Sequence, residues 1–99
     1  MHGVLDDYCK DHGIKRVDFI KIDVEGMDLA VLQGAVHILR TCRPRVAVTT
    51  YHHDYDAVRI TAFMRSVVPQ YKVRYNGMDG KWRRCHPMMA HFWVKSQQL

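Results

Sequence analysis

The chain has 99 residues, 47% of them apolar, and a formal net charge of +5. This length suffices for one small domain, and no apolar run approaches the ~18 residues that a membrane-spanning helix needs. The first residues lack the basic and apolar regions of a signal peptide. The three cysteines are odd in number and have no Cys-x-x-Cys spacing. They argue against a disulfide framework or a zinc site and favour reduced thiols in the cytoplasm.

The first three predicted elements are a helix, a strand and a longer helix. Apolar residues at helical spacing predict a helix over 4–12, and Gly13 can end it as a left-handed cap. The alternating run at 17–24 predicts a strand, and an apolar stripe predicts a single helix over 27–40. Gly34 lies inside this helix and would permit a close approach to the sheet.

The second half of the chain continues the alternation of strands and helices. The nearly continuous apolar run at 45–51 predicts a strand that is covered on both faces. The remaining predicted elements are a helix over 56–67, a strand over 71–75, a turn at 76–80 and, after a polar link, a final strand over 90–95.

This order predicts an α/β fold with a mostly parallel, Rossmann-like sheet and an antiparallel last strand. Four strands are few for an open sheet that is covered on both faces. The first strand is apolar enough for an interior position, yet only one helix precedes it. We therefore expect residues 1–99 to form a single, partial domain.

Acidic residues stand where the strand at 17–24 ends and the next helix begins. Ligands of open α/β sheets bind at this edge. Lys21 and Asp23 share one face of the strand, an arrangement that packing alone does not require. Asp23 and Glu25 are therefore candidate site residues; alternatively, Asp23 pairs with Lys21 and Glu25 caps the following helix. Gly26 would permit the tight turn from strand to helix.

Tyr51, His52 and His53 follow the second strand and are expected at the same edge of the sheet. A histidine there could act as a general base near neutral pH. An exposed loop histidine is an equally good explanation for His52 and a better one for His53. Tyr51 could line a substrate pocket, although packing explains it as well. No ligand spacing requires a metal site built from His52 and the nearby acids, and no metal is predicted.

The positive charges are scattered along the chain in short groups. Several groups fall at predicted helix ends, where a cation interacts favourably with the helix dipole. A solvated basic surface therefore explains the net charge better than a nucleic-acid partner does. A nucleic-acid-binding module stays open as a weaker hypothesis.

An ordered series of motifs runs through the chain. It comprises Asp-Phe-Ile-Lys-Ile-Asp-Val-Glu-Gly at 18–26, then Met27-Asp28-Leu29, Val31-Leu32, Gly34-Ala35, Arg43-Pro44, Tyr51-His52 and Pro69-x-Tyr71. This series resembles the FkbM family of S-adenosylmethionine-dependent methyltransferases, whose typical pattern is I-D-x-I-K-I-D-V-E-G-x-E-x-x-V-L-x-G-A. The resemblance covers about residues 14–76. It departs mainly at Asp28, where the family has glutamate.

The resemblance implies the C-terminal half of a class I methyltransferase domain, with the strand at 17–24 as the fourth of seven strands. The family's glycine-rich loop and ribose-binding acid belong to the first half. We find neither in this sequence, so we expect the N-terminal, cofactor-binding half to be absent from it. The implied cofactor is S-adenosylmethionine, bound together with that half and touched here by Asp23 and Gly26.

The expected function is an O-methyltransferase of the FkbM type, present as a fragment, that methylates a hydroxyl of a sugar, a glycan or a polyketide-like metabolite. Its carboxylates and histidine would orient or deprotonate the acceptor hydroxyl. The implied catalytic residues are Asp23, Glu25 and His52, and the implied acceptor-binding residues are Lys21, Tyr51 and His53. The alternative is a catalytically inactive remnant whose exposed strand edge pairs with a second copy or with an N-terminal half. No membrane partner is expected.

Overall fold

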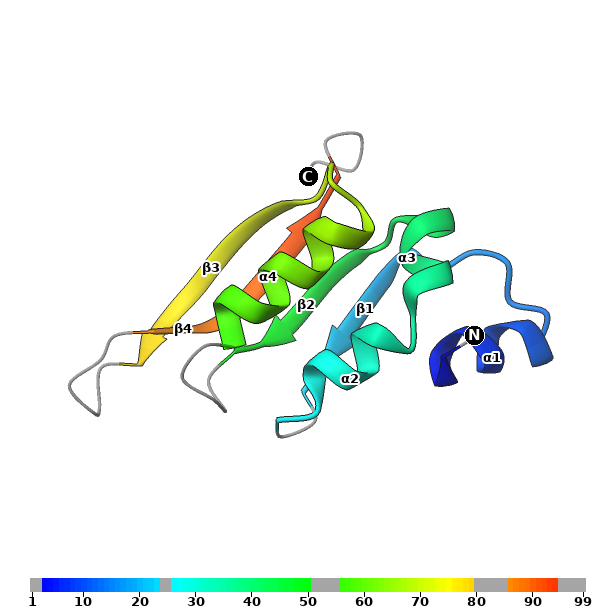
Figure 1. Ribbon diagram of the computed structural model, residues 1–99, viewed down its shortest axis with the longest axis horizontal. Coiled ribbons are helices and arrows are strands. Elements are labelled where there is room, and N and C mark those ends of the chain that lie inside the picture. The colour runs from blue at the N-terminus through cyan, green and yellow to red at the C-terminus, as the bar shows by residue number, and fades with distance from the viewer. Residues whose placement is uncertain (1–2, 24–25, 51–55, 80–85, 95–99) are drawn as a thin grey trace.

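A computed structural model describes residues 3–23, 26–50, 56–79 and 86–94 (Figure 1). The helices are α1 (Val4–Asp11), α2 (Asp28–Gln33), α3 (Val36–Cys42) and α4 (Asp56–Val67). The strands are β1 (Phe19–Ile22), β2 (Arg45–Thr49), β3 (Lys72–Asp79) and β4 (His86–Trp93). None of the helices in the described part of the chain has the length and hydropathy required to cross a lipid bilayer.

The four strands form one sheet in the order β1-β2-β4-β3. β1 and β2 are parallel, with Ile20 opposite Val46, whereas β4 is antiparallel to both of its neighbours. The last strand of the chain is thus inserted between β2 and β3. The predicted fold class, a mostly parallel α/β sheet with an antiparallel last strand, is confirmed.

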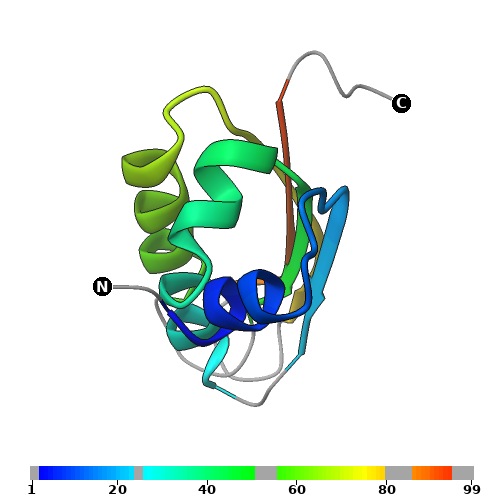
Figure 2. The same ribbon diagram turned by 90° about the vertical axis from the view of Figure 1, so that its right-hand side faces the viewer.

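The helices cover one face of this sheet. Figure 2 shows α2, α3 and α4 on the same side of the strands, and Figure 1 shows α1 beside the free edge of β1. The core between the sheet and these helices includes Leu32, Leu39, Ile60, Met64 and Phe92, each at most 1% exposed. No described helix lies over the opposite face of the sheet.

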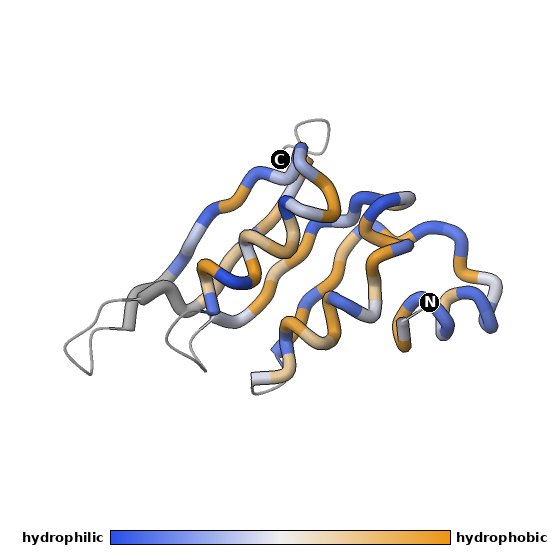
Figure 3. The backbone as a smooth tube through the Cα atoms, in the orientation of Figure 1, coloured by the Kyte–Doolittle hydropathy of each residue, from blue (hydrophilic) through white to orange (hydrophobic). Residues whose placement is uncertain are grey.

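β2 lies in the middle of the sheet and is the most thoroughly buried strand. Every residue from Val46 to Thr49 is at most 3% exposed, as the predicted continuous apolar run requires. In Figure 3 the hydrophobic colour runs along most of β2 but alternates along β3, which lies at the sheet edge. Hydropathy along the strands therefore follows their place in the sheet.

The prediction of a single helix over 27–40 is wrong, because the structure has two helices that are separated at Gly34 and Ala35. The start of α1 lies against this break. A Cβ atom on Gly3 would overlap the backbone of Gly34, and the Asp6 amide donates to the Gly34 carbonyl at 3.0 Å. Gly34 thus permits a close approach to α1, not to the sheet, and local helical periodicity could not reveal that contact.

Asp6 secures the second of these helices. Its two carboxylate oxygens accept the backbone N–H groups of His37 and Ile38, both at 3.0 Å. These are first-turn N–H groups of α3, which have no partner inside the helix. Asp6 therefore acts as a helix cap that is about thirty positions distant in the sequence.

The turn predicted at 76–80 is also wrong for its described residues. β3 continues through it to Asp79, with Asn76 opposite Met89 and Asp79 opposite His86. β4 likewise begins at His86, within the segment that we expected to be a polar link. Asparagine, glycine and aspartate favour turns, but the backbone hydrogen bonds to an adjacent strand outweigh that local preference.

The other predicted boundaries hold to within a few residues, and Gly13 has the left-handed φ of +64° expected of a helix cap. Tyr71 follows α4 in the chain and is buried in the core. Its hydroxyl donates to the Pro44 carbonyl at 2.6 Å, and its ring meets Phe92 edge-on at 6.2 Å between centroids. Burial raises the pKa of the Tyr71 hydroxyl, which keeps it protonated as a donor.

Candidate functional site

The parallel pair of β1 and β2 brings its two carboxyl ends to one edge of the sheet. Asp23 comes directly after β1, and Gly26 and Asp28 lead into α2. We call the edge formed by these three residues and Thr49 the acidic rim. Of the seven predicted site residues, Lys21, Asp23 and Gly26 are described. The other four, Glu25, Tyr51, His52 and His53, lie outside the described residues.

Asp23 and Lys21 are both exposed. Phe19 and Lys21 occupy alternate positions on the face of β1 opposite to Ile22, which is 4% exposed, so the predicted alternation is confirmed. Asp23 continues that alternation just beyond the end of the strand. The proposed pairing of Asp23 with Lys21 stays a prediction.

Gly26 adopts a φ of +87°. Side chains strongly disfavour this left-handed region, whereas glycine adopts it without strain. The prediction that Gly26 permits the tight turn from β1 into α2 is therefore confirmed.

The acidic rim contains a buried interaction that sequence reasoning did not single out. The Thr49 hydroxyl donates to an Asp28 carboxylate oxygen at 2.7 Å, and the two residues are 3% and 2% exposed. This bond joins the first residue of α2 to the last residue of β2. It thereby ties the start of α2 to the neighbouring strand. The available signal was the acid that the FkbM pattern has at this position.

The rim residues fit only part of an S-adenosylmethionine site. The exposed carboxylate of Asp23 and the turn glycine Gly26 lie at a strand end, where open α/β sheets bind their ligands. The six glycines include no Gly-x-Gly pattern that could approach its remaining portion after a strand. No cluster of three or more metal-binding side chains occurs in the described ranges.

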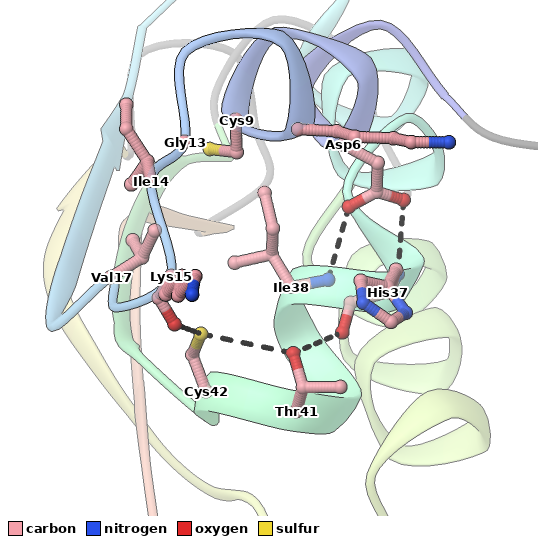
Figure 4. A pocket seen from close by; sticks show the side chains of 11 residues that line it. Asp6, Cys9, Gly13, Ile14, Lys15, Val17, His37, Ile38, Thr41 and Cys42 are labelled. Carbon is pink, nitrogen blue, oxygen red and sulfur yellow. Dashed lines mark hydrogen bonds between the residues drawn. The ribbon is translucent and has the colours of Figure 1, made fainter.

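A cavity of about 510 Å³ lies elsewhere, between α1, the segment that leads to β1, and α3 (Figure 4). Its walls are mainly apolar, and the cysteines Cys9 and Cys42 contribute free thiols to them. Figure 4 shows the Asp6 carboxylate directed at α3, where its hydrogen bonds to His37 and Ile38 are drawn. None of the predicted site residues lines this cavity, so it is separate from the acidic rim.

The structure also gathers cations that the sequence showed as scattered. The strand positions that face away from α2, α3 and α4 form a surface that we call the open face. It includes Phe19, Lys21, Arg45, Lys72, Arg74, His91 and Trp93. Four of these seven side chains are permanently cationic. Strand pairing, and not sequence proximity, places them together.

Comparison with known proteins identifies the chain's relatives. The Methyltransferase FkbM domain family matches residues 4–75. Among solved structures, the crystal structure of the methyltransferase FkbM from Methylobacillus flagellatus KT superposes with a TM-score of 0.60 and 28% sequence identity. That alignment covers 76% of this chain and only 19% of the relative, so the chain spans about a fifth of that protein's length. No curated protein matches the chain.

The matched region contains both strands of the acidic rim, the turn at Gly26 and the Asp28–Thr49 bond. The chain therefore belongs to the FkbM methyltransferase family.

Proposed function

We propose that this chain supplies the acceptor-side half of an S-adenosylmethionine-dependent O-methyltransferase of the FkbM type. The acidic rim carries the proposal, because it lies inside the family match and presents an exposed carboxylate at the end of a parallel strand. The expected acceptors are hydroxyls of sugars, glycans or polyketide-like metabolites. We expect a reducing compartment such as the cytoplasm, because the spacing of the three cysteines does not suggest a disulfide framework.

In this proposal the chain's own residues prepare the acceptor hydroxyl. Asp23, with Glu25 and His52, would orient the hydroxyl and accept its proton as the oxygen attacks. Lys21, Tyr51 and His53 would hold the rest of the acceptor. S-adenosylmethionine, when bound, supplies an electrophilic methyl group. The Thr49–Asp28 bond would keep the carboxylate-bearing turn in place between turnovers.

The cofactor site would be completed by an N-terminal half that carries the glycine-rich loop. Titration calorimetry with S-adenosylmethionine tests this directly. The 99-residue chain should show no tight binding, and a fusion to the first half of the Methylobacillus flagellatus relative should bind the cofactor. Micromolar binding by the chain alone would contradict the proposal that an N-terminal half is needed to complete the cofactor site. A folded fusion that does not bind the cofactor would contradict the proposed function.

Asp23→Asn in the fusion tests the role of the rim. Loss of a general base lowers a rate by roughly 10²-fold or more, so methyl transfer from radiolabelled cofactor to a panel of hydroxylated acceptors should fall by about that factor. Asp11→Asn is the matched control, because it removes the same charge from an exposed position in α1. Equal activity of the two variants would exclude Asp23 from the chemistry.

A second candidate function is pairing through the strand edge. β1 ends the sheet, so its outer edge has no strand partner among the described residues, and Phe19 on it is 55% exposed. Such an edge could add a strand from a second copy or from the N-terminal half. Sedimentation velocity over a dilution series should show self-association of the isolated chain. A monomer at every concentration would exclude pairing with a second copy.

A further inference from the structure

We propose that Thr49 is a positioning residue for the proposed methyl transfer, because it holds together the two ends of the connection from β1 to α2. This inference rests on the proposed function and deepens it, since it names the group that places the Asp23 carboxylate. It depends only on contacts inside the chain. Thr49 and Asp28 are 3% and 2% exposed, so any further segment packed on this chain would leave their hydrogen bond enclosed.

The strand register places the first end of this connection beside Thr49. β1 and β2 are parallel, with Ile22 opposite Val48. The next residues, Asp23 and Thr49, are therefore level with each other on neighbouring strands, which lie ~4.8 Å apart. The chain leaves β1 at Asp23, at the same level at which Thr49 ends β2.

A hydrogen bond brings the second end of the connection to the same residue. The Thr49 hydroxyl donates to an Asp28 carboxylate oxygen at 2.7 Å, and Asp28 is the first residue of α2. The chain thus leaves Thr49 at Asp23 and returns to it at Asp28, after passing through the left-handed Gly26. A short connection with both ends fixed has fewer conformations than one with a free end. The Thr49 hydroxyl therefore restricts where the Asp23 carboxylate can lie.

Thr49 lies on a well-supported part of the sheet. β2 pairs with β1 on one side and with β4 on the other, where Thr49 is opposite Met89. A functional side chain at the end of a strand is placed precisely only when packing and hydrogen bonds lock its supports. The central strand supplies such a support to the connection through the Thr49 hydroxyl.

Stability alone explains this buried polar pair less well. Replacing buried polar partners by apolar residues of similar volume is often neutral or stabilising, so a core does not need a carboxylate here. Within the described ranges, the buried polar or charged side chains are Asp6, Asp28, Thr49, Thr50 and Asp56. All except Asp6 lie where β1 or β2 gives way to the helix that follows it (Figure 1). Polar burial is thus concentrated at the edge that would carry the chemistry.

Thr49→Val in the fusion to the first half of the Methylobacillus flagellatus relative tests this role. The change removes the hydroxyl donor and keeps a branched side chain. A displacement of ~1 Å at a reacting group can cost about 10²-fold in rate, so kcat should fall at least about tenfold. KM for S-adenosylmethionine should change less than about threefold, because the other half would hold most of the cofactor. Thr49→Ser keeps the donor and should retain kcat within about threefold.

Thr61→Val is the matched control. It also removes a threonine hydroxyl, which contacts the Tyr75 hydroxyl at 2.8 Å and joins α4 to β3 instead of the rim. Its kcat should stay within about twofold of the natural fusion. All rates are expressed per folded molecule, as measured by circular dichroism. Equal losses of kcat in Thr49→Val and Thr61→Val, or in Thr49→Val and Thr49→Ser, would overturn the proposal.

Amide hydrogen exchange on the 99-residue chain tests the anchoring without any reaction. The Val31 amide donates to the Met27 carbonyl at 3.1 Å in the first turn of α2. Its exchange should accelerate at least about tenfold in Thr49→Val, because the start of α2 loses its tie to β2. The Leu39 amide, which donates to the Ala35 carbonyl at 2.9 Å in α3, should keep its rate. Unchanged exchange at Val31 would overturn the proposal.

The reaction assay separates the two proposals. A natural fusion that binds S-adenosylmethionine but methylates no hydroxylated acceptor would contradict the proposed function, and the positioning role would fail with it. An active natural fusion whose kcat is unaffected by Thr49→Val would contradict the positioning role alone. A lower kcat with rescue by Thr49→Ser is the expected result.

Discussion

The two faces of the sheet are built from the same four strands but have different chemistry. On the helix-covered face, Ile22, Val46, Val48 and Phe92 are at most 4% exposed. On the open face, the intervening positions carry the cations Lys21, Arg45, Lys72 and Arg74 and the 55% exposed ring of Phe19, whereas Ala47 on the middle strand is 3% exposed. Successive strand residues point to opposite faces, so a shift of one position exchanges core for surface.

This difference separates stability from binding. Apolar burial against α2, α3 and α4 supplies the favourable free energy of folding, and it leaves the opposite face free to carry charge. Exposed aromatic and cationic side chains contribute little to a core and are more informative about partners. Substitutions on the two faces should therefore affect different measurements.

The largest effect on the free energy of unfolding is expected from Phe92→Ala on the helix-covered face, and Phe19→Ala on the open face serves as the comparison. Phe92→Ala should lower the free energy of unfolding by about 3–5 kcal/mol, because it leaves a cavity in a core position that is 1% exposed. Phe19→Ala on the open face should change it by less than about 1 kcal/mol. Urea denaturation of both variants checks this difference. Comparable destabilisation would show that the open face is also a packed surface.

A smaller effect is expected at the contact between α1 and α3. Asp6→Ala removes the acceptor of the His37 and Ile38 amides and should cost about 1–2 kcal/mol. Asp7→Ala is the control, since this exposed neighbour in the same helix should change stability by less than about 0.5 kcal/mol. Thermal denaturation measures both changes. A neutral Asp6→Ala would mean that water caps α3 equally well.

Tyr71→Phe should cost about 1–3 kcal/mol near neutral pH, because it leaves the buried Pro44 carbonyl without its donor. Burial raises the pKa of Tyr71 in the folded chain above its unfolded value of about 10. Above that pH the unfolded chain binds fewer protons than the folded one, so the stability from this group decreases as pH rises.

Unfolding titrations from about pH 8 to 11 should therefore show a steeper loss for the natural chain than for Tyr71→Phe. Tyr75→Phe provides the comparison at the sheet edge, where the ring is 42% exposed and its hydroxyl contacts Thr61. Parallel pH profiles for the natural chain and Tyr71→Phe would exclude Tyr71 as the source of the alkaline loss.

The smallest effect on stability is expected from removing open-face charge. Lys72→Gln/Arg74→Gln should change the free energy of unfolding by no more than about 0.5 kcal/mol, because both side chains are exposed and neither has a recorded ion-pair partner in the described segments. Urea denaturation at low salt measures this. A loss of more than about 1 kcal/mol would show that these cations support the fold.

Much of the rim could be predicted from sequence because its signals are local. Asp23 and Gly26 follow an alternating apolar strand, and the φ of +87° at Gly26 is the conformation that a strand-to-helix turn requires. The Asp28–Thr49 bond could not be predicted, since the two residues are 21 positions apart and belong to different elements. The cap that Asp6 provides for α3 could not be predicted for the same reason, because Asp6 is more than thirty positions from the amides that it accepts.

The sequence by itself determined the strand-and-helix alternation and the buried middle strand, because hydrophobic periodicity and turn residues act over a few positions. The family followed from the resemblance of the motif series that begins at residues 18–26. Only the tertiary structure decided where α2 ends, how far β3 continues, and which cations share a face. Those features depend on partners that are distant in the chain: Gly3 against Gly34, His86 against Asp79, and Arg74 across the sheet from Lys21. Packing and strand pairing outweigh local preference wherever such partners meet.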